Sequence, residues 1–458
     1  MDIRKIESVH FIAIGGSVMH NLALALKKMG MRISGSDDEI YEPAAGKLKS
    51  GGIEANIGWQ PEKMDASIDL VVLGMHAKAD NPELAKAKSL KLPIVSFPDF
   101  IRRWSANQQR IVIGGSHGKS SITALAMHVL NQLNKKFDYL IGAEVEGFSL
   151  TVSLSDAPII IIEGDEYLAS KLDPVAKFLK YDHHIGLISG IAWDHKNVFP
   201  SFEDYTQQFE QFADKTPKAG SIIYNEKDLL AKKIGEKERE DVRKVPYGVH
   251  DAVIKNGVTY LKTKDYGEVK ISVFGDHNLE NIGAVLALVK LLGIEEKAFY
   301  QAVQTFTGAK KRLEIVKQQG NDKLFKDYAH SPSKLEATTT ALKKQFADSK
   351  VVVAYELHTF SSLNKEFIKE YKNTLSKADE AFIFINPHNI KNSHTDDLTT
   401  TEIQEAFNNT ELTLFTDKHK LVEAMKKAKT TEKNIFALLS SGNFDGLDIE
   451  EVSHKLIA

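Results

Sequence analysis

Residues 114–121 constrain the fold of this chain more than any other segment, because their glycines join two apolar patterns of different period. A continuous apolar run at residues 111–113 comes directly before them. Apolar residues then recur at spacings of three and four between Ile122 and Leu133, which predicts one buried face of a helix. The order strand, glycine turn, helix is typical of a parallel α/β sheet that presents a ligand-binding turn at its edge.

The same turn has the residues that bind a nucleotide triphosphate. Backbone N–H groups at the start of a helix attract phosphate oxygens. Lys119 is placed to reach the β- and γ-phosphates, and the Ser120 hydroxyl is placed to ligate Mg²⁺. The usual pattern has a glycine six residues before the lysine, where this chain has Ile113. A glycine turn that only caps a helix is the alternative, but capping does not require a Lys-Ser pair, so we favour phosphate binding.

Strand and helix patterns alternate along the rest of the chain as well. Repeated βαβ units of this kind predict parallel sheets with helices on both faces. Strands are expected at residues 10–14, 31–35, 70–74, 93–96, 159–162, 185–188, 351–354, 381–385 and 435–439. The predicted fold class is therefore α/β with three domains. These are a Rossmann-like N-terminal domain at residues 1–107, a central P-loop ATPase domain with a parallel sheet at 108–313, and a Rossmann-like C-terminal domain at 314–458.

Composition excludes several other classes of protein. The formal net charge of −3 over 458 residues gives no basic patch, so we expect no nucleic-acid partner. The chain has no cysteine, which excludes disulfides, thiolate metal sites and a cysteine nucleophile. The N-terminus lacks the apolar core of a signal peptide, and no stretch approaches the roughly 20 apolar residues that cross a bilayer. We therefore expect a cytoplasmic protein without a membrane partner.

Two polar clusters follow predicted strands of the central region. Glu163 comes directly after four isoleucines, and the pair Asp194 and His195 follows the strand at residues 185–188. Ligands of parallel sheets gather at the carboxyl ends of the strands, where the phosphate turn also lies. Glu163 and His195 are therefore expected to meet Lys119 there, and oxygen and imidazole ligands suit Mg²⁺. A satisfied core histidine is the alternative for His195 taken alone.

Two further clusters lie later in the chain. Asn278 and Asn281 precede a run of small and apolar residues, where an asparagine is also an ordinary N-cap. Asp327 and His330 follow the first strand of the third region, just before a Ser-Pro pair that is typical of a helix start. Taken alone, neither cluster predicts a site.

Taken together and in order, these motifs resemble the Mur ligases, the ATP-dependent amide-bond-forming enzymes of bacterial peptidoglycan synthesis. The resemblance covers nearly the whole chain, and the ordered set is specific where no single motif is. It rests on residues 115–121, 163–167, 194–195, 276–281, 311–314, 327–330 and 441–444. The segment around Glu166 and Tyr167, with residues 176–181, is similar to the branch that acts in peptidoglycan recycling.

The resemblance implies a role for each matching residue. It assigns phosphate binding to the turn and to Lys119, and metal binding to a second set. The turn set is Gly115, Ser116, His117, Gly118, Lys119, Ser120 and Ser121; the Mg²⁺ set is Ser120, Glu163 and His195. Asn278 and Asn281 are implied to contact the adenine side of ATP, and Arg312 and Asp327 to reach the nucleotide, with His330 near the transferred phosphate. Catalytic roles thus fall to Lys119, His195, His330 and Arg312. The implied site for the UDP moiety comprises Gly15, Gly16, Ser36, Asp37 and His76.

The implied reaction joins UDP-N-acetylmuramate to an amine through an acyl phosphate, with ATP and Mg²⁺ as cofactors. The recycling branch implies the tripeptide L-alanyl-γ-D-glutamyl-meso-diaminopimelate as the acceptor, and the sister branch, which adds L-alanine, is the alternative. The sister branch has an arginine that holds the acceptor carboxylate, whereas residues 356–362 here contain none. We therefore expect the tripeptide. The oligomeric state, monomer or homodimer, stays open.

Two other classes compete with a ligase. A nicotinamide-dependent dehydrogenase would use the N-terminal turn, with Asp37 on the ribose, but only one glycine of its G-x-G-x-x-G fingerprint falls in place. A nucleotide-gated switch would keep the phosphate turn but would need no sugar-nucleotide domain. Because the ATP contacts are divided between the central and third regions, we also expect the domains to close around the substrates.

Overall fold

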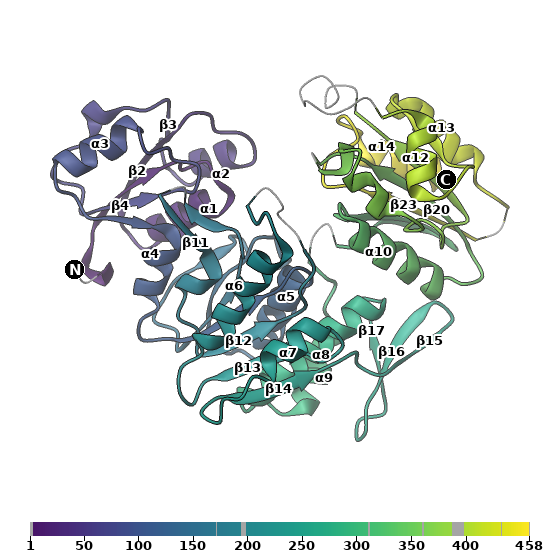
Figure 1. Ribbon diagram of the computed structural model, residues 1–458, viewed down its shortest axis with the longest axis horizontal. Coiled ribbons are helices and arrows are strands. Elements are labelled where there is room, and N and C mark those ends of the chain that lie inside the picture. The colour runs from purple at the N-terminus through teal and green to yellow at the C-terminus, as the bar shows by residue number, and fades with distance from the viewer. Residues whose placement is uncertain are drawn as a thin grey trace. The chain divides into compact units, whose positions relative to one another are not determined.

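The computed structural model describes residues 3–170, 172–193, 198–309, 312–359, 361–386, 398–431 and 433–457. The chain forms two compact units. The first comprises residues 1–249 and 280–303, and the second comprises residues 250–279 and 304–458. The first unit contains two of the large sheets and the second contains the other (Figure 1).

The N-terminal sheet is wholly parallel and has its first strand at its centre. Its order is β3 (Asn56–Ile57), β2 (Arg32–Asp37), β1 (Ser8–Ile12), β4 (Leu70–Leu73) and β5 (Ile94–Ser96). Alternate strand residues pack into different cores, as expected for a sheet covered on both faces. Helices α1 (Ser17–Lys28) and α4 (Phe97–Trp104) cover one face, and α3 (Pro82–Ser89) covers the other. Helix α2 (Ala44–Ser50) packs beside α1.

The central sheet places the phosphate turn at its middle strand. Its order is β14 (Arg243–Tyr247), β13 (Ser221–Asn225), β12 (Ile185–Ile188), β6 (Gln109–Gly114), β9 (Ile159–Glu163), β7 (Asp138–Leu140) and β8 (Val152–Ser153). Only β8 pairs antiparallel. The strands β12, β6 and β9 therefore end side by side, which brings the turn and Glu163 to one edge. The accompanying helices are α5 (Lys119–Gln132), α6 (Phe202–Asp214), α7 (Leu229–Gly235), α8 (Asp276–Leu291) and α9 (Glu296–Val303).

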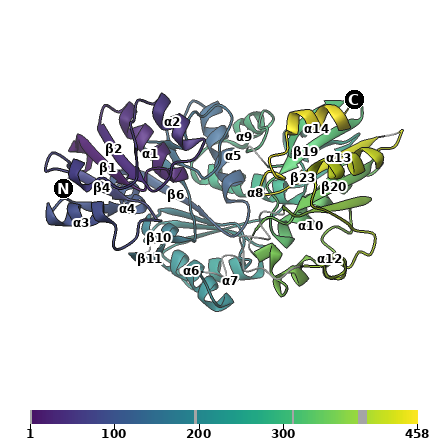
Figure 2. The same cartoon turned by 90° about the horizontal axis from the view of Figure 1, so that it is seen from above.

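The C-terminal sheet has helices on both faces, as Figure 2 shows. Its order is β18 (Glu314–Gln319), β19 (Asp322–Asp327), β23 (Asn434–Leu439), β20 (Lys350–Glu356), β21 (Glu380–Phe384) and β22 (Thr413–Phe415). Only β18 pairs antiparallel. One core lies under α10 (Pro332–Gln345) and α12 (Thr400–Phe407). The other lies under α13 (Lys418–Lys427) and α14 (Ile449–Leu456).

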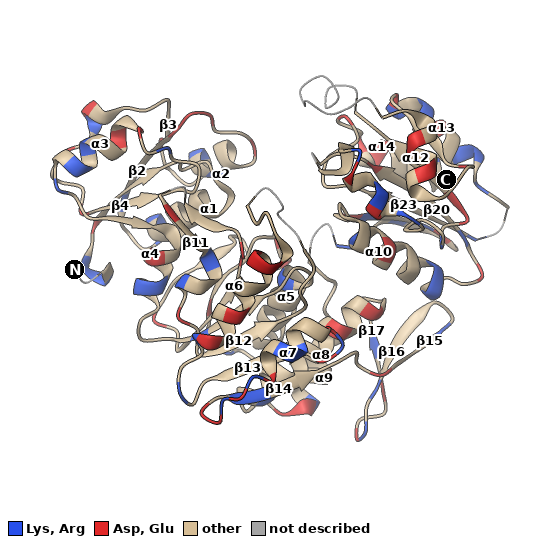
Figure 3. Ribbon diagram, viewed as in Figure 1, with Lys and Arg blue, Asp and Glu red and all other residues tan. Residues whose placement is uncertain are grey.

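The predicted α/β class with three parallel-strand domains is confirmed, and each predicted strand is present within a few residues of its expected bounds. Two small antiparallel sheets were not predicted. They are β10 (Leu168–Ser170) with β11 (Asp173–Ala176), and β15 (Ala252–Lys255) with β16 (Val258–Lys262) and β17 (Glu268–Ile271). Within the described residues, no helix is long and apolar enough to cross a membrane. Basic and acidic residues are interspersed along helices such as α10 and α13 (Figure 3).

Candidate functional site

The phosphate turn depends on two glycines in the left-handed region. Gly115 has a φ of 133° and Gly118, the N-cap of α5, has a φ of 78°. A side chain at Gly115 would lie 2.0 Å from Ser189 Oγ, and one at Gly118 would lie 2.6 Å from Asn281 Oδ1. Only glycine fits both positions without strain. The turn thus brings its backbone close to Asn281, a residue that sequence analysis placed at the nucleotide.

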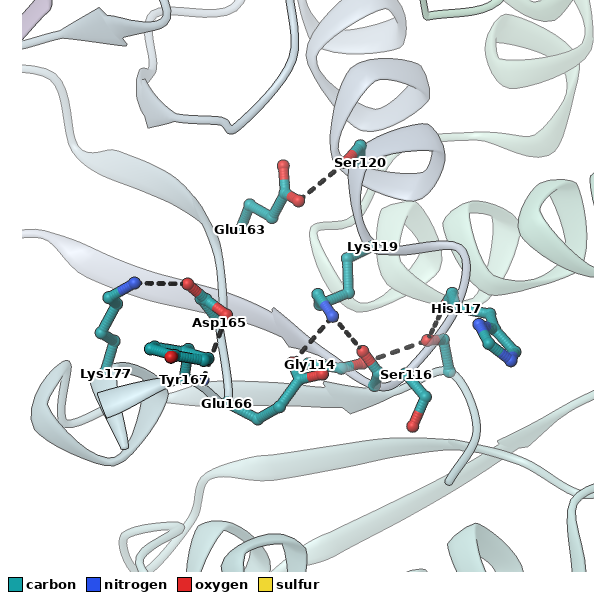
Figure 4. A network of polar contacts seen from close by, with 12 residues as sticks. Gly114, Ser116, His117, Lys119, Ser120, Glu163, Asp165, Glu166, Tyr167 and Lys177 are labelled. Carbon is teal, nitrogen blue, oxygen red and sulfur yellow. Dashed lines mark hydrogen bonds and ion pairs between the residues drawn. The ribbon is translucent and has the colours of Figure 1, made fainter. Parts of the chain in front are cut away.

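Lys119 lies at the start of α5 and points back into the turn (Figure 4). Its Nζ donates to the Gly115 carbonyl at 2.5 Å and to Glu166 Oε2 at 2.7 Å. Burial alone would lower the pKa of Lys119, but the nearby carboxylates, with Glu166 foremost, outweigh burial and raise it. The ammonium is therefore charged and held where a triphosphate would lie against the turn.

Ser120 and Glu163 come together as the strand order predicts. The Ser120 hydroxyl donates to Glu163 Oε1 at 2.7 Å, and the Gly142 N–H donates to Glu163 Oε2 at 2.7 Å. Asp194 and His195 lie outside the described residues. Within the part of the chain that the structure describes, no group of three acidic, histidine or cysteine side chains is arranged to hold a metal ion. Two of the three predicted Mg²⁺ ligands therefore meet.

A polar network behind the turn was missed by sequence analysis. The buried Glu166 accepts from the Tyr205 hydroxyl at 3.0 Å, and Tyr205 lies 2.7 Å from Ser116 Oγ. Ser116 Oγ also accepts from the Ala192 N–H at 2.9 Å. Ser116 thus faces the protein interior, not solvent. The acidic motif at residues 163–166 pointed to the region, but nothing in the sequence linked Glu166 to a tyrosine 39 residues further on.

The two remaining polar residues of the turn are less enclosed. The His117 carbonyl accepts a hydrogen bond from the Ser189 hydroxyl, which ties the turn to the segment after β12. Ser121 is half-buried in the first turn of α5. Neighbouring Asp165 pairs with Lys177 at 2.5 Å; burial would raise the Asp165 pKa, but Lys177 and Lys119 outweigh it and lower that pKa. Each acidic side chain near the turn therefore has its own partner.

The predicted sugar-nucleotide residues lie around the turn between β1 and α1. The Gly15 N–H donates to Asp37 Oδ2 at 2.8 Å, and Gly16 is the N-cap of α1. Burial raises the pKa of Asp37, partly offset by the Gly15 N–H, and a charged His76 would act to lower it. His76 is exposed. Gly15, Gly16, Asp37 and His76 are thus gathered at one edge of the N-terminal sheet.

The Ser36 side chain is buried and does not face a position that a substrate could occupy. It is fully buried, and its hydroxyl donates to Glu83 Oε1 at 2.6 Å. Glu83 also accepts from the Gln60 N–H at 2.8 Å and pairs with His10 Nε2 at 3.1 Å. Burial would raise the pKa of Glu83, but its hydrogen bonds with His10 and Ser36 outweigh burial and lower it. The Ser36 hydroxyl therefore serves a buried network, not a ligand-facing contact.

The second unit carries the other predicted nucleotide residues. Asp327 ends β19 and accepts from the Thr338 hydroxyl at 2.6 Å. The Arg312 guanidinium lies over the Tyr328 ring at 4.9 Å from its centre, and that ring contacts His330 edge to face. His330 Nδ1 lies 3.0 Å from the Tyr328 carbonyl. Arg312, Asp327 and His330 are thus gathered around one strand end. Asn278, in the same unit, donates to the Phe274 carbonyl at 2.8 Å.

Residues 356–362, which contain no arginine, place a histidine beside a buried acid. Glu356, at the end of β20, is buried and accepts from the Ser440 hydroxyl and from the Phe444 N–H at 2.9 Å. Its Oε1 lies 3.6 Å from His358 Nδ1, and the nearby Glu356 carboxylate raises the pKa of His358. A side chain at Gly442 would collide with this pair. A partly exposed imidazole whose protonation is favoured by a buried carboxylate therefore lies at the carboxyl edge of the C-terminal sheet.

Family models and curated relatives match this arrangement along most of the chain. The models for the Mur ligase family catalytic domain, middle domain and glutamate ligase domain match residues 8–109, 113–289 and 311–442. The UDP-N-acetylmuramate–L-alanine ligase of Carboxydothermus hydrogenoformans is 30% identical, covering 83% of this chain and 82% of the relative. The enzyme of that name from Lactobacillus acidophilus is 32% identical, covering 83% and 85%.

The chain belongs to the Mur ligase family. It is an ATP-dependent ligase that forms an amide bond.

Solved structures of this family share the fold. The UDP-N-acetylmuramate-alanine ligase of Thermotoga maritima superimposes with a TM-score of 0.72 at 23% identity, covering 98% of each chain. A murein peptide ligase of Psychrobacter arcticus superimposes with a TM-score of 0.63 at 20% identity, again covering 98% of each. At these identities the likeness concerns the fold alone.

The expected tripeptide acceptor is wrong. The curated relatives at about 30% identity over most of this Mur ligase are named for L-alanine as the acceptor, which is the alternative reading. The expectation relied on the similarity of residues 166–167 and 176–181 to the recycling branch and on the absence of an arginine in residues 356–362. In the structure the second stretch contains His358, whose pKa is raised by the neighbouring Glu356.

Proposed function

We propose that this protein joins L-alanine to UDP-N-acetylmuramate in peptidoglycan synthesis, splitting ATP to ADP and phosphate. The observation that carries the proposal is the meeting of Lys119, Ser120 and Glu163 at the phosphate turn. The names of the curated relatives support the sugar nucleotide and the acceptor.

Activation of a carboxylate explains why ATP is needed. The lactyl carboxylate of UDP-N-acetylmuramate is a poor acyl donor, and transfer of the γ-phosphoryl group gives it a good leaving group. The amine then attacks, and the tetrahedral intermediate collapses to the amide with loss of phosphate. In this scheme Lys119 and Arg312 neutralise charge that develops on the phosphoryl oxygens. His330 is assigned a place near the transferred phosphate, and Asn278, Asn281 and Asp327 contact the nucleotide.

Mg²⁺ fits the donors of the phosphate turn. A serine hydroxyl and a carboxylate already lie 2.7 Å apart at the start of α5. Hard oxygen donors of this kind suit Mg²⁺, which keeps several water ligands and bridges phosphate oxygens. We propose that Ser120 and Glu163 hold the ion, with His195 as the third ligand. When bound, the ion neutralises the charge of the β- and γ-phosphates.

The other assignments remain proposals of the same scheme. Gly15, Gly16, Asp37 and His76 bind the UDP moiety, while Ser36 acts through Glu83 and not directly. His358 binds the acceptor carboxylate in its protonated form, which the neighbouring Glu356 favours by raising its pKa. Domain boundaries near residues 107 and 313, and closure of the domains around substrate, stay predictions.

Release of ADP tests the proposal directly. With UDP-N-acetylmuramate, L-alanine and Mg²⁺, the protein should release ADP at a rate that depends on all three additions. L-Alaninamide, which lacks the carboxylate, should be a poor acceptor for the wild-type protein and an equal one for His358→Gln. If correctly folded protein releases no ADP above background, the ligase activity is contradicted. If His358→Gln still prefers L-alanine to L-alaninamide as strongly as the wild type, only the role of His358 is contradicted.

A further inference from the structure

Glu166 is a buried acid beside the lysine of the phosphate turn. Its side chain has no exposed surface, whereas that of Lys119 is 15% exposed. An ionised carboxylate without a partner is costly to bury. Its contacts include Lys119 Nζ at 2.7 Å from Oε2 and the Tyr205 hydroxyl at 3.0 Å from Oε1. Both oxygens of the buried carboxyl group therefore accept hydrogen bonds from the protein.

The contacts fix the direction of the lysine as well as its charge. An ammonium has three N–H donors. One is directed to the Gly115 carbonyl and one to Glu166 Oε2 (Figure 4). This leaves one donor for a phosphate oxygen. The Lys119 side chain is thus already oriented toward the turn before ATP binds, and ATP binding does not have to fix its rotamer.

The contact between Glu166 and Tyr205 is part of a network that joins several segments of the central domain. Glu166 follows β9, Tyr205 lies on α6, and Ser116, which contacts the Tyr205 hydroxyl at 2.7 Å, belongs to the turn. The Ala192 N–H, from the segment after β12, donates to Ser116 Oγ at 2.9 Å. Movement of Glu166 would break its contacts with Lys119 on α5 and Tyr205 on α6. The network therefore makes Glu166 a fixed counter-charge.

We propose that Glu166 is a positioning residue that orients Lys119 for phosphoryl transfer at the expense of ATP affinity. Its negative charge opposes the triphosphate and offsets part of the attraction of Lys119, so it weakens binding of ATP. The ammonium that it holds in place needs no reorganisation when charge develops in the transition state. The proposal rests on the proposed function where turnover is concerned, but not where ATP binding is concerned.

Two measurements on Glu166→Gln separate affinity from turnover. The Kd of ATP alone, from isothermal titration calorimetry, should fall by roughly two- to fivefold, because the variant lacks the negative charge that opposes the triphosphate. The kcat for ADP release with UDP-N-acetylmuramate and L-alanine should fall by roughly 10²-fold, because the lysine is no longer held in place. Glu166→Asp keeps the charge and should restore the wild-type Kd. Tyr205→Phe should lower kcat less than Glu166→Gln does.

Asp138→Asn is the matched control. Asp138 is another fully buried acid of the central sheet, paired with Gln108 and Ser155 away from the turn. Its variant should lower the melting temperature but leave the ATP Kd and the kcat per folded molecule unchanged. If Glu166 had only a structural role, Glu166→Gln would likewise lower the melting temperature and leave the ATP Kd and the kcat per folded molecule unchanged.

The binding measurement decides the proposal even if the ligase assignment fails. An ATP Kd that rises or stays unchanged in Glu166→Gln overturns it, as does a kcat within twofold of wild type. In the Lys119→Met background, the Glu166→Gln change should no longer alter kcat, since the group to be oriented is gone. If wild-type protein releases no ADP with UDP-N-acetylmuramate and L-alanine, the proposed function fails, while the ATP Kd still tests Glu166.

Discussion

Two glycine turns join a strand to a helix in this protein, and they differ in the charge placed against them. In the turn between β6 and α5, the Lys119 ammonium donates a hydrogen bond to the carbonyl of Gly115, a residue of the same turn. The turn between β1 and α1 has a carboxylate, Asp37, which accepts the Gly15 N–H at 2.8 Å. The same local pattern therefore prepares one turn for a polyanion and the other for a different ligand group.

The difference follows from elementary electrostatics. Backbone N–H groups at a helix start attract an anion. In the central domain a lysine adds to that attraction, whereas in the N-terminal domain the Asp37 carboxylate already accepts the Gly15 N–H. A carboxylate at this point is suited to accept hydrogen bonds from the hydroxyl groups of a ribose. A glycine turn alone thus does not identify a triphosphate site; the side chain against it does.

Lys119→Ala gives the largest expected effect. It removes the group that distinguishes the two turns, so ADP release should fall by roughly 10³-fold, as when a transition-state donor is lost. Circular dichroism should show an intact fold. Lys88→Ala, at an exposed position of α3, is the matched control and should behave as wild type. Ligation at the wild-type rate by Lys119→Ala would remove the basis for the whole site.

The second largest effect is expected when a glycine of each turn is replaced by alanine, because only one of the two turns lacks room for a side chain. Gly118 has a φ of 78° and no room for a side chain beside Asn281, so Gly118→Ala should cost about 1–3 kcal/mol of stability and weaken ATP binding. Gly16 has a φ of −56°, and an added Cβ would make an ordinary 3.5 Å contact with Met19. Gly16→Ala should change the free energy of unfolding by less than about 0.5 kcal/mol. Equal losses in urea denaturation would contradict the comparison.

Asp37→Asn should give a smaller and more selective effect. The KM for UDP-N-acetylmuramate should rise by roughly tenfold through loss of a charged hydrogen-bond acceptor, while the Kd of ATP stays unchanged. Burial raises the pKa of Asp37 above its ordinary 3.8, so the folded protein holds this proton to higher pH than the unfolded chain. Stability from this group therefore falls as pH rises between the two pKa values, and the variant should lack that slope. A lower KM for UDP-N-acetylmuramate would mean that Asp37 repels the substrate.

The sequence predicted what depends on local pattern and on strand order. Continuous apolar runs located the parallel strands, and parallel order implied that Ser120 and Glu163 would meet at one edge. Contacts between distant segments were not predictable. Lys119 and Glu166 are 47 residues apart, and Ser36 is turned inward by an acid, Glu83, that no motif marks. The acceptor was misjudged because the absence of an arginine does not by itself identify the group that the site binds.

One competition experiment tests the central claim, that this Mur ligase uses L-alanine. Wild-type protein is given ATP, Mg²⁺ and UDP-N-acetylmuramate with equal concentrations of L-alanine and L-alanyl-γ-D-glutamyl-meso-diaminopimelate, and the products are resolved by mass spectrometry. Their initial ratio equals the ratio of the two kcat/KM values. The account predicts that UDP-N-acetylmuramoyl-L-alanine exceeds the tripeptide product by roughly 10²-fold, a discrimination that one binding site can supply. A predominance of the tripeptide product would contradict it.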